Sequence, residues 1–483
     1  MNRSKRTNRF RPPIKIILSL LAAALFALAI GPSVAQAAPQ PFAGNKLTVT
    51  NLHKFDTVSI YRIVTISVDP QTNVQSYEFT ADFGITKAQW ERDAKDATNL
   101  QADANKIAQY VHDNDGSQAL DKKSKNSPGE SVEFDGLYAG QYLVVVTNED
   151  DLTRVFQNTV VSVLPAKQAD GSFAPANVSA AIKFTDLSGT GVNKLVNGKK
   201  WEDRIDNGDT AKFTITSVIP QYADPSTRTF MFSDSMTMGL DYQHDLKVAA
   251  GTTELTLGTD YAIGDKVNFF HTITILPSAL GKYANQPITI TYSAKFVTTG
   301  NRPVYARAES NTVYLKFSPN SVGANADDEI KIVSSNVSIT IYGLHLKKIS
   351  STDGHALAGA EFSVRAPGGA EVATAKTDAQ GNVNIVGALA AQKDYTLKET
   401  KAPAGYAPVA DMHFTIESRL VQDYKGYQYD LGNIKDTPTG FDTLLPTTGG
   451  PGTIAVTAVG VFIVAGTAAW IIRSRRRRDV PTA

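Results

Sequence analysis

Short segments in which apolar and polar residues alternate recur along the central part of the chain, and they constrain the fold more than any other feature. Such a period of two gives each strand one apolar face. The segments are rich in β-branched and aromatic residues and are separated by turns with glycine, asparagine and aspartate. The clearest are 46–51, 142–147, 159–164, 212–217, 272–275, 287–292 and 312–317. The sequence therefore predicts an all-β protein of tandem Ig-like β-sandwich domains.

One segment departs from this pattern. From Thr86 to Val111 the apolar residues recur at helical spacing, and Thr86-x-x-Gln89 has the form of a capping box. We expect this segment to be helical decoration on the first sandwich.

The N-terminus has the composition of an export signal. Basic residues are followed by an apolar stretch over 16–30 and then by the small residues of Val34-Ala35-Gln36-Ala37-Ala38. This order predicts a signal peptide over 1–37 and a secreted protein. An uncleaved membrane anchor is the alternative, but the apolar stretch is short.

The C-terminus combines a pentapeptide, an apolar run over 453–472 and a tail of arginines. About 20 apolar residues span a bilayer, and the arginines favour a cytoplasmic end. The pentapeptide is Leu445-Pro446-Thr447-Thr448-Gly449. It resembles the LPXTG sorting signal of Gram-positive surface proteins, which a sortase cleaves between Thr448 and Gly449 to make a new covalent bond. We therefore expect 441–483 to be a sorting segment that is transiently membrane-spanning, and the cell-wall peptidoglycan to be a partner.

Charge and cysteine content exclude several classes of protein. The whole chain has 48 basic and 47 acidic residues, but eleven basic residues and one acid lie in the two ends that processing would remove. The remaining 37 basic and 46 acidic residues give a net charge of about −9, which argues against a nucleic-acid binder. There is no cysteine, so an exported chain of this kind must be stabilised without disulfides. Its length suggests three domains, over 38–184, 185–340 and 341–440.

Three polar residues of the third block fall on apolar strand faces. Alternation places Lys348 with the two leucines of the first strand, 344–348, and Asn433 with the tyrosines and leucine of the last strand, 427–433. Glu399 shares a face with an inward tyrosine and leucine. Burying these groups is costly unless they pair, so we expect them to meet.

The third block resembles the Cna-B-type domain of Gram-positive surface proteins. The match lies in Leu-Ala-Gly-Ala-Glu-Phe over 357–362 and in Tyr-x-Leu-x-Glu-Thr-x-Ala-Pro-x-Gly-Tyr over 395–406. Such domains form a spontaneous lysine–asparagine isopeptide bond with help from a glutamate. The resemblance implies that Lys348 attacks the Asn433 side-chain amide, that ammonia leaves and that Glu399 moves the protons.

Burial suits this chemistry, because desolvation lowers the pKa of a lysine and raises that of a carboxyl group. Close positioning then supplies much of the acceleration. A buried lysine–glutamate ion pair without a covalent bond is one alternative. Use of Lys347, which alternation faces outward, is another.

The second block resembles the isopeptide-forming middle domain of fimbrial shaft subunits. Its first strand carries Lys194, its last predicted strand carries Asn311, and Asp234 opens the segment Asp-Ser-Met-Thr-Met-Gly-Leu between them. The resemblance implies a Lys194–Asn311 bond assisted by Asp234. A surface lysine and a turn asparagine without a bond are the alternative, and the nearby alternative residues are Lys199, Lys200 and Asn301.

Major pilins of Gram-positive bacteria also carry a lysine that a sortase joins to the next subunit. It follows a strand near the end of their N-terminal domain in a Tyr-Pro-Lys signature. Residues 158–165 resemble the preceding strand, and Lys183 stands where the lysine would be, but Ala181 and Ile182 replace the tyrosine and proline. Lys167 is the alternative, and use of neither lysine is a third possibility.

No motif indicates turnover of a substrate. The seven histidines are scattered without ligand-like spacing, and there is no phosphate-binding glycine loop or nucleophile elbow. We expect no metal, no cofactor and no enzymatic activity beyond the intramolecular cross-linking.

The sequence thus predicts a structural shaft subunit of a sortase-assembled, adhesive cell-wall pilus, or fimbrium. Its expected partners are a sortase, copies of itself joined through lysine–threonine bonds, minor pilins and a host-surface ligand. The alternative is a minor pilin or a monomeric wall-anchored adhesin.

Overall fold

The computed structural model describes residues 40–439, except 69–74, 115–119, 190, 207, 238, 265–269, 297–307, 324–329 and 418–427. These residues form two compact units. The first reaches Ile341 and includes Leu389–Ala391, and the second begins at Tyr342. All seven predicted strand segments form strands, so the prediction of an all-β fold is confirmed. The predicted signal peptide and sorting segment lie outside the described residues, and the predicted division of the first unit near residue 184 stays a prediction.

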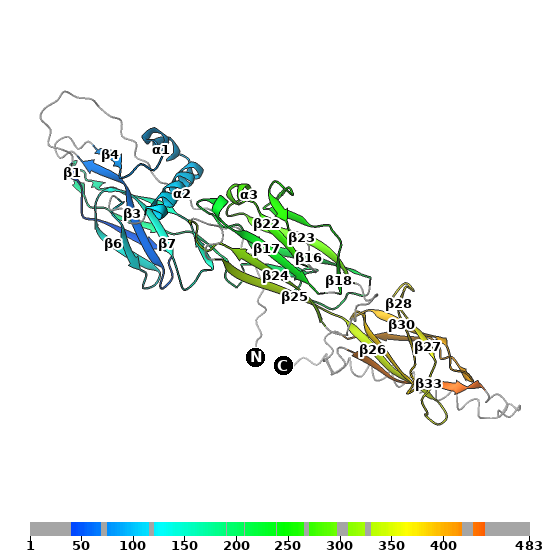
Figure 1. Cartoon of the computed structure of the whole chain (residues 1–483). Coiled ribbons are helices and arrows are strands. Elements are labelled where there is room, and N and C mark those ends of the chain that lie inside the picture. The colour runs from blue at the N-terminus through cyan, green and yellow to red at the C-terminus, as the bar shows by residue number, and fades with distance from the viewer. Residues whose placement is uncertain are drawn as a thin grey trace, which may run out of the picture. The chain divides into compact units, whose positions relative to one another are not determined.

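The N-terminal part of the first unit is a β-sandwich with two helices against one sheet (Figure 1). The larger sheet contains β1 (Gln40–Pro41), β3 (Thr57–Val68), β7 (Gly140–Thr147) and β9 (Thr159–Val163), with β4 (Gln75–Phe79) and β5 (Lys123–Asn126) paired to β3. The smaller sheet contains β12 (Asn177–Ala181), β2 (Asn45–Thr50) and β6 (Ser131–Leu137). Two short pairs complete this part: β8 (Arg154–Phe156) with β13 (Phe184–Asp186), and β10 (Ala166–Lys167) with β11 (Phe173–Ala174).

The larger sheet buries both of its faces. Val58 and Ile60 pack into the core between the two sheets, whereas Tyr61 and Ile63 of the same strand pack into the core under the helices. The helices are α1 (Lys87–Asp93) and α2 (Ala97–Asp113).

The helical decoration expected from Thr86 to Val111 is confirmed, and it consists of two helices. Thr86 caps α1 as predicted, by accepting a hydrogen bond from the Gln89 main-chain nitrogen at 3.2 Å. The chain leaves the first helix after Asp93. Asp96 then has an extended backbone, and its side chain accepts hydrogen bonds from the Thr98 and Asn99 main-chain nitrogens, which starts α2.

The rest of the first unit is a larger sandwich around one apolar core. One sheet contains β14 (Asn193–Val196), β16 (Thr210–Val218), β23 (Pro287–Phe296), β19 (Lys247–Ala250) and β20 (Thr253–Glu254), with β18 (Leu240–Tyr242) paired to β23. The facing sheet contains β15 (Trp201–Glu202), β25 (Lys331–Thr340), β24 (Ala308–Phe317), β17 (Phe230–Met236), β22 (Phe270–Ile275) and β21 (Tyr261–Ile263). The short helices are η2 (Pro225–Thr227) and α3 (Pro277–Lys282).

The second unit is a smaller sandwich of two four-stranded sheets. One contains β29 (Asn382–Leu389), β26 (Tyr342–Ser350), β33 (Gln428–Pro438) and β31 (Tyr406–Ala407). The other contains β28 (Glu371–Lys376), β27 (Glu361–Arg365), β30 (Asp394–Lys401) and β32 (Met412–Thr415). The first strand, β26, and the last, β33, lie side by side and run parallel.

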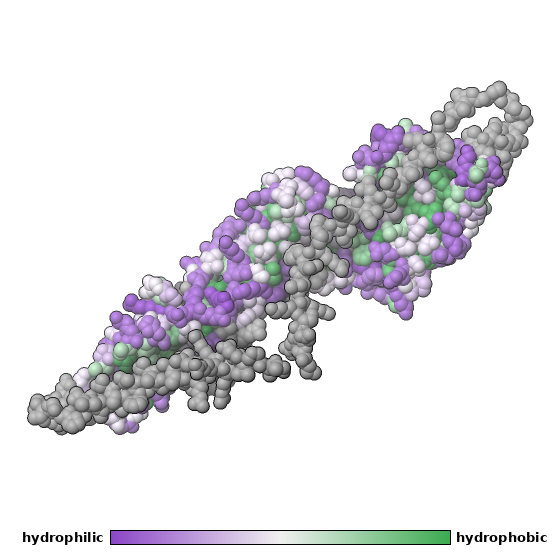
Figure 2. Space-filling model, turned by 180° about the vertical axis from the view of Figure 1, so that it is seen from behind, coloured by the Kyte–Doolittle hydropathy of each residue, from purple (hydrophilic) through white to green (hydrophobic). Residues whose placement is uncertain are grey.

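Hydrophilic residues cover much of the visible surface of the described part of the chain, with apolar residues showing between them (Figure 2). Among the described residues, no helix has the length and apolar character needed to span a membrane.

Candidate functional site

The first candidate site is a lysine that crosses the core of the larger sandwich. Lys194 lies on β14 with its side chain fully buried. Its Nζ forms a short ion pair with Asp234 of β17 and lies 2.5 Å from the Oδ1 of Asn311 on β24. Strands β17 and β24 are neighbours in the sheet that faces β14. The structure therefore brings together the three residues that the sequence singled out in this block.

The sequence did not single out Tyr292, a fourth member of this cluster. Its hydroxyl lies 2.9 Å from the Lys194 Nζ and accepts a hydrogen bond from the Asn311 Nδ2 at 2.6 Å. Its ring stacks on Phe213, with 5.1 Å between the ring centroids. Alternation along the predicted strand 287–292 would have placed Tyr292 inward with two isoleucines, but it gives no partner for the hydroxyl.

The surroundings of this lysine favour its neutral form. Burial lowers the pKa of Lys194 to about 8, although the Asp234 carboxylate acts in the opposite direction. The other oxygen of Asp234 is buried and has no hydrogen-bond partner among the described residues. A neutral amine beside an amide carbon can form a new amide bond with loss of ammonia.

One expectation about this block is wrong. The strand with Asn311, β24, is not the last strand of its sandwich, because β25 follows it and pairs alongside it. Lys194 and Asn311 come from opposite sheets, so a bond between them would tie the two sheets together rather than the first strand to the last. Of the alternatives, Lys199 and Lys200 are exposed, and Asn301 lies outside the described residues.

The second candidate site is a buried lysine in the second unit. The side chains of Lys348 on β26, Glu399 on β30 and Asp436 on β33 are all fully buried. The Nζ of Lys348 lies 3.0 Å from the Glu399 Oε2 and forms a short ion pair with Asp436. The sequence correctly predicted the burial of the lysine and the glutamate, and Lys347 is exposed as expected.

The prediction that Asn433 faces inward is wrong. Asn433 is exposed and lies opposite Lys347. The pairing of β26 with β33 shifts by one residue between His345 and Lys347, and Gly432 has a φ of +70° at this irregularity. One extra residue on one strand reverses the faces of all residues that follow it, so Asp436 takes the buried place that unbroken alternation assigned to the asparagine.

The Glu399 carboxyl group of this cluster is in an environment that favours its protonation. Burial raises the pKa of Glu399, against the opposing effects of a hydrogen bond from the Val409 main chain and of the Lys348 amine. One oxygen of Glu399 and one of Asp436 are buried without a hydrogen-bond partner among the described residues. A neutral amine and a protonated carboxyl group in contact can condense to an amide with loss of water.

The two lysines considered for joining subunits are both exposed, in different settings. Lys183 lies between β12 and β13, and its carbonyl oxygen accepts a hydrogen bond from the Gln157 main chain at 2.8 Å. The preceding carbonyl, of Ile182, accepts from the Asn51 side chain at 2.6 Å. Lys167 lies in the two-stranded ribbon of β10 and β11. The main chain at Lys183 is thus held on both sides while its side chain is free to react.

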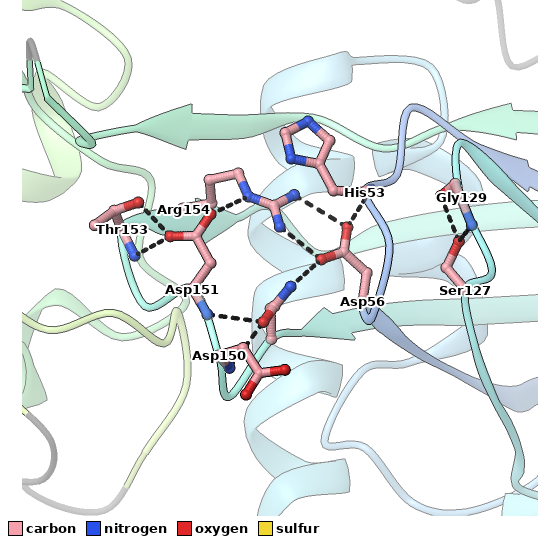
Figure 3. A network of polar contacts seen from close by, with 9 residues as sticks. His53, Asp56, Ser127, Gly129, Asp150, Asp151, Thr153 and Arg154 are labelled. Carbon is pink, nitrogen blue, oxygen red and sulfur yellow. Dashed lines mark hydrogen bonds and ion pairs between the residues drawn. The ribbon is translucent and has the colours of Figure 1, made fainter.

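An ion-pair network surrounds the buried Arg154 (Figure 3), and no sequence pattern pointed to it. The Arg154 guanidinium binds both oxygens of Asp56, at 2.7 and 3.0 Å, and Asp151 at 3.1 Å. Phe184, the residue after Lys183, packs against the same guanidinium. The network therefore connects the start of β3 to the strand pair that begins beside Lys183.

No group of three or more potential metal-ligating side chains occurs within the described ranges.

Comparison with known proteins gives a match to one domain family and a match to one fimbrial protein over part of the chain. Residues 343–427 match the family model of the SpaA prealbumin-like fold domain. The chain is 25% identical over 335 residues to the fimbrial subunit type 2 of Actinomyces naeslundii, covering 59% of this chain and 61% of that protein. The chain thus spans less than two thirds of the length of this relative.

The fold of this chain was compared with solved structures, and it is similar to those of two pilins. The T6 backbone pilin of serotype M6 Streptococcus pyogenes, described as a modular three-domain structure, aligns with a TM-score of 0.55 at 16% identity, covering 77% of this chain and 80% of that one. The full-length major pilin SpaD from Corynebacterium diphtheriae aligns with a TM-score of 0.47 at 21% identity, covering 82% of this chain and 98% of that one. This chain therefore shares the fold of the T6 backbone pilin.

Proposed function

We propose that this chain is the structural shaft subunit of a covalently polymerised pilus on a Gram-positive cell surface, and that it acts as a building block rather than as an enzyme. The observation that carries the proposal is the pair of fully buried lysines, each in contact with a carboxyl group, in a chain with a backbone-pilin fold. The likeness to a fimbrial subunit supports it.

Two internal cross-links belong to this proposal. Lys194 and Asn311 form an amide with release of ammonia, assisted by Asp234. Lys348 and Asp436 form an amide with release of water, assisted by Glu399. When a buried lysine and carboxylate are replaced by a neutral amide, the desolvation free energy of the two charges no longer destabilises the folded state.

Assembly uses the two ends of the subunit. A sortase cleaves between Thr448 and Gly449, and the threonine carbonyl is then joined to the Nζ of Lys183 on the next subunit. The last subunit is joined to peptidoglycan instead. The exposed side chain of Lys183 on a main chain held by hydrogen bonds supports this choice over Lys167.

Two experiments test the proposal. The mass of the secreted subunit should fall below the calculated value by about 17 Da for lost ammonia and about 18 Da for lost water, and cross-linked peptides should contain the residue pairs named above. An unchanged mass would refute the internal bonds.

For polymerisation, Lys183→Arg should abolish the high-molecular-weight ladder of wall extracts, whereas Lys167→Arg should leave it intact. The reverse result would transfer the role to Lys167. A ladder that survives both changes would favour the minor pilin or monomeric adhesin, which shares the anchor without polymerising through its own lysine.

A further inference from the structure

The Tyr292 hydroxyl bridges the two nitrogen atoms that exchange places in the Lys194–Asn311 reaction. It lies 2.9 Å from the Nζ of Lys194, the attacking nitrogen, and 2.6 Å from the Nδ2 of Asn311, the leaving nitrogen. Tyr292 is only 4% exposed. Its ring is held by stacking on Phe213 at an interplanar angle of 18°. The hydroxyl is thus fixed at hydrogen-bond distance from both reacting groups.

The chemistry needs a group at this position. When the amine adds to the amide carbon, the lysine nitrogen gains a positive charge and must lose a proton. The asparagine nitrogen must gain one before it can leave as ammonia. Direct transfer between two nitrogens on the same carbon would pass through a strained four-membered ring. A hydroxyl that accepts one proton and donates another enlarges that ring to six members and aligns both transfers.

We propose that Tyr292 is a catalytic residue of Lys194–Asn311 bond formation, relaying a proton from the lysine Nζ to the leaving Nδ2 of the asparagine. This role rests on the cross-link proposed above.

The steps of the reaction balance. Lys194 first gives a proton to Asp234, and its neutral amine attacks the Asn311 Cγ. Tyr292 then donates its hydrogen to Nδ2 and takes one from Nζ, so it ends as it began. The Cγ–Nδ2 bond breaks, the carbonyl re-forms, and the departing ammonia takes the proton from Asp234.

Two features suit the tyrosine to this task. Burial first, and then the neighbouring Asp234 charge, raise the pKa of Tyr292 well above its usual range, so the phenol retains the hydrogen it must donate. Asp234 forms its own ion pair with the lysine and also neighbours the Tyr292 hydroxyl. The carboxylate can therefore accept the first proton while the hydroxyl serves the second transfer.

The test follows the bond as it forms. The full chain is made in a short cell-free pulse, chased for set times and quenched in denaturant, and the cross-linked peptide is measured by mass spectrometry. Tyr292→Phe keeps the ring and removes the hydroxyl, so it should slow bond formation by roughly 10²-fold. Tyr222→Phe is the matched control, because its hydroxyl is buried in the same core but donates to the Ser318 carbonyl at 3.1 Å. It should form the bond at the wild-type rate.

The outcomes separate this inference from the proposal beneath it. If the wild-type chain forms no bond, the cross-link itself is refuted and the relay with it. If Tyr292→Phe forms the bond as fast as the wild type, the relay is refuted and the cross-link stands.

A measurement on the wild-type chain covers the case in which Tyr292→Phe does not fold. The rate of bond formation is measured in mixtures of light and heavy water and plotted against the deuterium fraction. If two protons move in the same step, the plot should be curved. A linear fall, or no fall, would overturn the relay.

Discussion

Replacing Asp436 with alanine gives the most direct test of the cluster in the second unit. Without this carboxyl group no amide can form with Lys348, and the lysine and Glu399 remain as an unbonded buried pair. Asn433→Ala is the matched control, since Asn433 is exposed three residues away on the same strand. It should leave the cross-link and the stability of the unit nearly unchanged.

The size of the effect follows from the loop that the bond closes. Lys348 and Asp436 are 88 residues apart in sequence. By the chain-entropy argument used for disulfides, closing a loop of this length stabilises the folded state by roughly 4–5 kcal/mol. For a domain of this size, that loss lowers the melting temperature of the second unit by on the order of 20 °C.

Calorimetry of the full chain measures the melting temperature of the second unit, and the intact mass shows whether the bond has formed. In Asp436→Ala the mass deficit of about 18 Da should be absent, and the second unit should melt at the lower temperature. The reasoning is refuted if Asn433→Ala removes the bond, with a mass change of ammonia rather than water, while Asp436→Ala keeps it.

Three further predictions concern the first unit. Attack on Asn311 needs the neutral amine of Lys194, and burial lowers the pKa of this lysine to about 8. The rate of bond formation should therefore rise as the pH is raised towards 8 and level off above it, whereas a rate that falls above pH 8 would show that the reaction needs the proton shared with Asp234. Arg154→Ala leaves the buried Asp56 without its positively charged partner and should cost about 3–5 kcal/mol in unfolding free energy by denaturant titration. A loss under 1 kcal/mol would show that water reaches the carboxylate. Lys200→Ala should keep the mass deficit of the Lys194–Asn311 bond in peptide mapping, because Lys200 is exposed. Loss of that deficit would show that Lys200, and not Lys194, is the nucleophile.

Local sequence pattern was sufficient for most of the fold. Strand segments such as 212–217 and 287–292 were found because alternation and β-branched composition are properties of neighbouring residues. The burial of Lys348 and Glu399 followed from the same rule, and so did the N-cap at Thr86. The break between the two helices was missed, because a helical period continues across Asp96 and only the cap geometry shows that the chain restarts there.

The sequence by itself determined that Lys348 is buried and needs a polar partner, because a period of two assigns a face to every residue of an unbroken strand. Only the tertiary structure decided the partners. The irregularity at Gly432 exchanged Asn433 for Asp436, and packing of the two sheets brought the Tyr292 hydroxyl between Lys194 and Asn311, which are 117 residues apart. The physical reason is that one inserted residue reverses every later face, and contacts across a core depend on how distant strands meet.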